Sequence, residues 1–146
     1  MRTFTELFAS ISDAFSQPMI RKPIAIGLGA IAGAVTRYYL TVWLASRFGT
    51  SFPYGTFFVN LTGCFIMGCF TVFSGRIEAI SPELILLLGV GFLGSYTTFS
   101  TYELDTHRLL QNNGVSWIVF FYWMGSAVLG VIGIQLGLIF GRLLIR

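Results

Sequence analysis

The chain has few charged residues for its length. Only 10% of its 146 residues are Asp, Glu, Lys or Arg, whereas 55% belong to the hydrophobic class, and the mean hydropathy is +0.78. Soluble domains carry roughly 25% charged residues. A water-facing surface cannot be built from this inventory, so the composition disfavours a soluble fold and indicates a membrane protein.

Histidine and cysteine, which are common catalytic residues and metal ligands in enzymes, are also scarce, with one histidine and two cysteines in the chain. Cys64 and Cys69 have neither CxxC nor metal-site spacing, and we interpret them as small apolar filler. Glu103 and His107 lie four apart, as a metal pair would, but no third ligand is obvious. We therefore interpret them, together with Asp105, as solvated charge at the end of a span. No GxxxxGK[ST] phosphate-binding motif occurs, and we expect no enzyme activity.

Four apolar segments are long enough to cross a bilayer as helices, at about residues 24–46, 54–74, 84–107 and 115–141. Their connections are short, so we expect an all-α membrane protein with one four-span membrane domain, residues 23–146. Residues 1–22 stand apart from it. Their hydrophobic residues recur at helical spacing, which predicts either an amphipathic helix on the membrane surface or a disordered tail.

The basic residues predict an orientation. With four spans, one side of the membrane carries the larger group, namely Arg2, Arg21, Lys22, Arg76, Arg142 and Arg146, and the other carries Arg47 and Arg108. The positive-inside rule then places both termini in the cytoplasm. The charges form no basic block, so we expect no nucleic-acid partner.

The third segment contains the run GSYTTFST at residues 94–101. Hydrocarbon offers no water to hydroxyl groups, so this polar density is tolerated only where it faces a partner, a cavity or an ion. Because Gly91 and Gly94 precede the hydroxyls, we predict a broken third helix whose freed carbonyl oxygens coordinate a hard cation. The alternative is that each hydroxyl donates to the carbonyl one turn earlier.

Asn60 places an amide inside the second segment, with Thr56 one turn before it and Cys64 one turn after. An amide in hydrocarbon must be hydrogen-bonded. It either fixes the packing between helices or presents its N–H groups to an anion. Phe99 and Tyr102, three apart in the third segment, have positive ring edges that attract an anion in a narrow passage; plain packing is the alternative.

Glycines at four-residue spacing predict close helix contacts, at Gly29 and Gly33 and again at Gly130, Gly133, Gly137 and Gly141. These contacts lie either within one chain or between chains. Four spans make too thin a bundle to enclose a pore, so we also expect self-association.

The motifs GAIAGAVTRYYL, GTFFVNLTG and GFLGSYTTFST, in this order, closely resemble the Fluc (CrcB) fluoride channel family over about residues 24–142. The resemblance implies an antiparallel, dual-topology homodimer with two anion pathways. It also implies a structural sodium ion at the dimer centre, held by the backbone carbonyls of Gly94 and Thr97 of both subunits.

The resemblance also implies the residues of the ion pathway. Asn60 matches the family's central asparagine, Phe99 and Tyr102 match its two phenylalanines, and Ser126 matches a polar serine of the fourth span. Tyr122 lies one turn before Ser126, Thr56 lies one turn before Asn60, and Arg37 matches the family's first-span arginine.

Three features depart from the family pattern. Tyr102 adds a hydroxyl to the aromatic pair, and Ser95 stands where glycine is common. The bias of the loop charges also opposes equal insertion in both orientations.

The function implied is a multi-pass channel of the bacterial cell membrane. It would export cytoplasmic fluoride passively and so lower its toxicity. One alternative is a small proton-coupled exporter of organic cations, which needs a carboxylate inside the membrane. The other is a structural subunit of a membrane complex, which would not need the hydroxyl run.

Overall fold

The computed structural model describes residues 17–76 and 80–145. Within them, every regular element is helical, which confirms the expected all-α class. Most of the predicted N-terminal extension falls on residues 1–16, outside the described residues.

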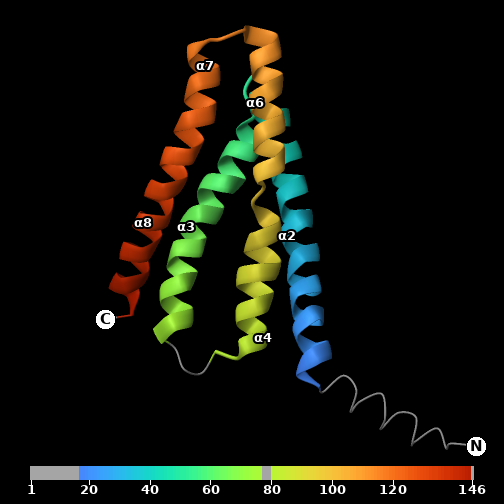
Figure 1. The fold of residues 1–146 in the computed structure, drawn as a ribbon, viewed down its shortest axis with the longest axis vertical. Coiled ribbons are helices and arrows are strands. Elements are labelled where there is room, and N and C mark those ends of the chain that lie inside the picture. Colours follow the sequence, from blue (N-terminus) through green and yellow to red (C-terminus); the bar gives the residue numbers. More distant parts are fainter. Residues whose placement is uncertain (1–16, 77–79, 146) are drawn as a thin grey trace, which may run out of the picture.

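Four helical spans run along the long axis of the molecule (Figure 1), and each is long and apolar enough to cross a membrane. The first two are single helices, α2 (Pro18–Phe48) and α3 (Tyr54–Arg76). The third and fourth are composite. They consist of α4 (Pro82–Ile85), the π-helix η1 (Leu86–Leu93), α5 (Gly94–Tyr96) and α6 (Phe99–Asn113), and then of α7 (Trp117–Phe120), the π-helix η2 (Phe121–Gly125) and α8 (Ser126–Leu144).

Local sequence explains where the spans begin and end. Helix α2 begins at Pro18, inside the segment assigned to the extension, since proline suits the first turn of a helix. The third span begins after Ser81, whose hydroxyl accepts the Leu84 amide at 3.2 Å. It ends before Gly114, which has a φ of 60° that side chains resist.

The helices pack as two close pairs, α2 with η1 and α3 with α8. A methyl group on Gly29 or Gly33 would collide with backbone carbonyls of η1, and one on Gly137 would collide with the Phe65 carbonyl of α3. These glycines therefore serve packing within one chain, which was one of the two expected uses.

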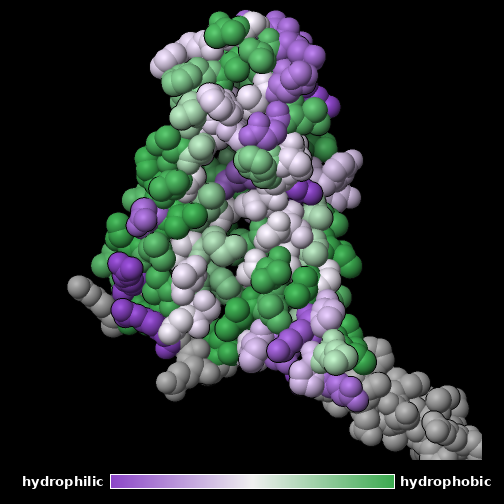
Figure 2. Space-filling view, in the orientation of Figure 1, coloured by the Kyte–Doolittle hydropathy of each residue, from purple (hydrophilic) through white to green (hydrophobic). Residues whose placement is uncertain are grey.

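Hydrophobic residues cover much of the flanks, and hydrophilic residues lie mainly toward the two ends (Figure 2). Helix α2 begins at the end of the bundle where α8 ends (Figure 1). Arg21, Arg76 and Arg142 lie there, and Arg21 pairs with Glu83 at 3.6 Å. This distribution fits a multi-pass protein with its flanks in lipid.

The contact between α2 and η1 gives a first prediction. Gly33→Ala should destabilise the protein by about 1–3 kcal/mol or more, because its methyl group meets the rigid Phe92 carbonyl. The control is Gly27→Ala in the same helix, where nothing lies within 4 Å of the added carbon. Thermal melting in detergent should drop for Gly33→Ala alone, and equal melting of the two variants would contradict this packing.

Candidate functional site

The third span is interrupted midway along its length (Figure 1). Helix α5 ends at Tyr96 and α6 begins at Phe99, and the two residues between them are extended. Thr97 has φ −85° and ψ 160°, and Thr98 has φ −152° and ψ 122°. The Thr97 hydroxyl donates to the Leu93 carbonyl, one turn earlier, at 3.0 Å. This is the arrangement that the alternative interpretation of the hydroxyl run predicts. The Thr98 hydroxyl instead caps α6 by accepting an amide of its first turn at 3.2 Å.

Asn60 on α3 pairs with the backbone of Thr98. Its Nδ2 donates to the Thr98 carbonyl at 2.9 Å, and its Oδ1 accepts the Thr98 amide at 2.7 Å. In a continuous helix that amide would donate to the Gly94 carbonyl, four residues earlier. The amide side chain thus takes up the polar groups that the interruption exposes, and Nδ2 keeps a second N–H group that this pairing does not use.

A groove of about 390 Å³ runs beside this pairing, between α3, α6 and α8. It brings together most of the residues predicted for the ion pathway, namely Asn60, Phe99, Tyr102 and Ser126, and it also contacts Thr97. The Phe99 ring is 74% exposed, the largest exposure among the predicted pathway residues. Its centroid lies 5.7 Å from that of Tyr102, with 42° between the ring planes. The groove therefore combines an amide, a hydroxyl and an exposed aromatic side chain beside the interruption of the third span.

The hydroxyl that distinguishes Tyr102 from phenylalanine is hydrogen-bonded. It donates to the Trp123 carbonyl at 2.5 Å. Trp123 lies in η2, and π-turns displace backbone groups from their usual helical partners. The added hydroxyl thus ties α6 to the fourth span.

Two further hydroxyls of the predicted pathway are buried without a partner in the described part of the chain, those of Tyr122 and Ser126. The Tyr122 side chain is fully buried, and its ring lies perpendicular to Phe52 at a centroid distance of 5.4 Å. Buried hydroxyls are normally hydrogen-bonded. Ser126 lines the groove, so its hydroxyl is a donor available there, whereas Tyr122 is not among the residues that line the groove.

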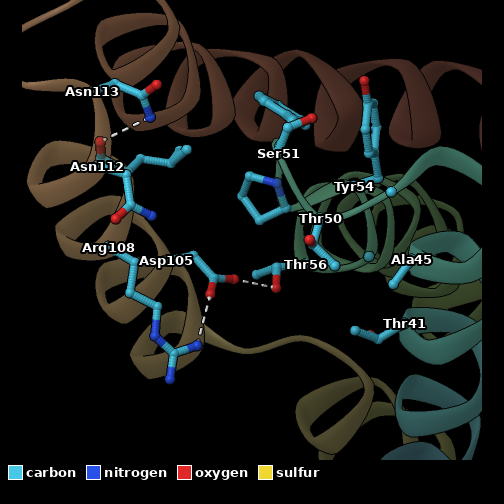
Figure 3. Close-up of a pocket in the computed structure, with 15 residues that line it drawn as sticks. Thr41, Ala45, Thr50, Ser51, Tyr54, Thr56, Asp105, Arg108, Asn112 and Asn113 are labelled. Atoms are coloured by element: carbon cyan, nitrogen blue, oxygen red, sulfur yellow. Dashed lines mark hydrogen bonds and ion pairs between the residues drawn. The ribbon is translucent and has the colours of Figure 1, made fainter.

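Thr56 lies outside the groove and lines a second, more polar pocket of about 490 Å³ at one end of the bundle (Figure 3). Its hydroxyl donates to Asp105 Oδ2 at 2.6 Å, and Asp105 Oδ1 lies 3.7 Å from Arg108 (Figure 3). The Asp105 side chain is only 13% exposed. Its interpretation as solvated charge is therefore wrong, whereas Glu103 and His107 are exposed as expected. The sequence shows only that Asp105 lies near the end of a span. It does not reveal the contact with Thr56, which lies 49 positions earlier in the chain.

The predicted sodium ligands lie at the interruption. Arg37 on α2 places Nη1 3.5 Å from the Thr97 carbonyl, so a positive charge already lies near one of them. The Gly94 residue is exposed, and a carbon added to it would meet only the Gly89 carbonyl, at 3.8 Å. Among the described residues no cluster of three His, Cys, Asp or Glu side chains could hold a metal.

Comparison with known proteins agrees with these features. The family model described as CrcB-like protein, Camphor Resistance (CrcB), matches residues 24–138. A curated protein of Trichormus variabilis named fluoride-specific ion channel FluC is 59% identical, over 87% of this chain and 93% of its own length. Relatives with the same name in Synechococcus sp. and Synechocystis sp. are 52% and 47% identical. Their alignments cover 86% and 84% of this chain and 96% and 94% of the relatives.

Removing the Tyr102 hydroxyl tests the link between α6 and η2. Tyr102→Phe should cost about 0.5–1.5 kcal/mol of stability, the net contribution of one hydrogen bond. Tyr39→Phe is the control, because Tyr39 is 66% exposed on the outside of α2. Thermal melting of both variants checks this, and an unchanged melting temperature for Tyr102→Phe would contradict the link to Trp123.

Proposed function

The chain belongs to the CrcB-like family, and from this premise we propose that it is a fluoride-selective ion channel. Fluoride would leave the cytoplasm passively, down its gradient, through the groove beside Asn60. The names of the relatives support the choice of ion. The observation that carries the proposal for this chain is the groove itself, in which Asn60, Ser126 and Phe99 meet beside the interruption of the third span.

The available donors suit a small anion that holds water tightly. A selective path must replace the hydration shell of such an ion with strong hydrogen-bond donors. The free N–H of Asn60 and the unpartnered hydroxyl of Ser126, which both line the groove, are donors of this kind. The exposed Phe99 ring adds a positive edge. Larger halides would fit these fixed donors less well, which provides selectivity.

The pathway needs a second subunit, and we infer a homodimer in which the two copies insert in opposite orientations. The groove is open, and Phe99 projects from it with most of its ring exposed. A partner over this face would close the passage and shield the ring. The antiparallel sense comes from the resemblance to the family, and the loop charges impose only a modest bias against it.

A structural sodium ion fits the interruption. The Thr98 amide donates to Asn60, which leaves the Gly94 carbonyl without its helical donor, and Gly94 is an exposed residue. The Thr97 carbonyl has two lone pairs, so it can accept from Arg37 and still face a cation. Each subunit would supply these two oxygens. The bound ion would hold the dimer together and attract an anion nearby.

The two alternatives explain less of this geometry. An exporter of organic cations needs a carboxylate that is free to bind the cation inside the membrane. Among the carboxylates that the structure describes, Asp105 is the most buried, but it is held by Thr56 and Arg108 at one end of the bundle. A subunit with a purely structural role would not need the unpartnered Ser126 hydroxyl beside a groove.

Ion flux from liposomes that contain the purified protein tests the proposed function. Fluoride should leave when a potassium ionophore balances its charge, while chloride is retained, and an ion-selective electrode measures both. Equal efflux of the two ions would contradict selectivity. Protein-free liposomes give the background leak, and fluoride efflux no faster than this background would contradict the channel.

Substitution of Ser126 tests the pathway itself. Ser126→Ala should slow fluoride efflux about tenfold or more, because a hydrogen bond to a charged group contributes about 1.5–3 kcal/mol. Ser46→Ala is the matched control, since the exposed Ser46 hydroxyl donates to the Trp43 carbonyl of its own helix at 2.8 Å. Equal fluoride efflux from the two variants would remove Ser126 from the pathway.

Phe99→Ile keeps the hydrophobic bulk but removes the ring edge. The variant should slow fluoride efflux roughly threefold to tenfold, because an aromatic edge contributes about 0.5–1.5 kcal/mol. The same liposome assay measures the change. A variant as fast as the unmodified channel would show that the exposed ring takes no part in conduction.

A further inference from the structure

We propose that Asn60 is a positioning residue that couples the anion pathway to the cation site, in addition to donating to the anion. It does so by keeping the Thr98 amide away from the Gly94 carbonyl. The inference rests on the proposed function and assigns this chain's asparagine a second task in it.

The first step is a competition for one amide. The Thr98 N–H has two possible acceptors, the Gly94 carbonyl of a continuous helix and Asn60 Oδ1, and it donates to Oδ1 at 2.7 Å. Asn60 also satisfies the Thr98 carbonyl through Nδ2, at 2.9 Å. Both bonds engage a single residue, so the interruption is stabilised at the point where the helix would otherwise continue.

The second step follows from the membrane. An unpaired amide costs several kcal/mol in hydrocarbon, because no water replaces the missing bond. Without Asn60, the Thr98 N–H would therefore return to the Gly94 carbonyl and extend α5 across the interruption. That carbonyl would then be occupied by its helical donor and could not bind a cation.

The third step concerns the orientation of the amide. The Thr98 N–H requires Oδ1 on its own side, and the Thr98 carbonyl requires Nδ2 on the other. This pairing fixes the positions of Oδ1 and Nδ2 in the Asn60 side chain. Asn60 lines the groove, so the remaining N–H of Nδ2 is held as a donor and is not exchanged for an acceptor by a flip of the amide.

Helix α3 holds the other side of the interruption independently. The Thr62 hydroxyl lies 2.9 Å from the Tyr96 hydroxyl, within hydrogen-bond distance. This contact anchors the end of α5 but does not involve the Thr98 amide. Thr62 therefore offers a comparison residue that lies two positions from Asn60 and leaves the Gly94 carbonyl unchanged.

The experiment measures two properties of each purified variant: fluoride efflux from liposomes, and thermal melting in detergent with sodium or with N-methylglucamine as the cation. The variants are Asn60→Leu, which has similar volume and no hydrogen-bonding groups, Thr62→Val and Ser126→Ala. The unmodified protein should melt at a higher temperature in sodium.

Asn60→Leu should lose most of this sodium-dependent increase together with its fluoride efflux. Ser126→Ala should lose efflux but keep the sodium-dependent increase, because it touches no backbone of the interruption. Thr62→Val should melt at a lower temperature in both cations and keep the increase. A full sodium-dependent increase in Asn60→Leu would overturn the coupling.

Asn60→Asp provides a second test where Asn60→Leu does not fold. Aspartate retains an acceptor for the Thr98 amide but no donor for the anion, so it should keep the sodium-dependent increase and lose fluoride efflux. Loss of both would overturn the inference. Failure of the proposed function is distinct from either result, since the unmodified protein would then show no selective fluoride efflux.

Discussion

The arrangement depends on one side-chain amide that takes over hydrogen bonds which an interrupted helix has lost. Backbone polar groups inside a bilayer must be satisfied by protein, so a span cannot open unless something replaces its helical bonds. Asn60 does this for Thr98 with two bonds, at 2.9 and 2.7 Å. The free Gly94 carbonyl, the fixed amide and the position of Phe99 at the start of α6 all follow from this pairing.

The surrounding helices keep that pairing in register. Glycine contacts bring α2 against η1 and α3 against α8 so closely that backbone meets backbone. Helix α3 therefore carries Asn60 at a fixed distance from α8, which carries Ser126. The hydrogen bond from the Tyr102 hydroxyl to the Trp123 carbonyl ties α6 to η2, which precedes α8 in the fourth span. The donors Asn60 and Ser126 are thus carried by helices rather than by loops.

The sequence predicts the four spans and the interrupted third helix because hydropathy and clustered hydroxyls reflect local energetics. It also identifies Asn60, Phe99, Tyr102 and Ser126, which the fold brings to one groove. Pairings across the bundle have no local signal. The burial of Asp105 against Thr56 and the acceptor of the Tyr102 hydroxyl therefore emerge only from the packed helices.

Solid-state NMR of the protein in lipid bilayers would test the central claim most directly, using labels at Thr98 and Asn60. The account predicts chemical shifts of extended backbone at Thr98 and magnetisation transfer between its amide and the Asn60 side-chain carbonyl. Helical shifts at Thr98 without that transfer would contradict it.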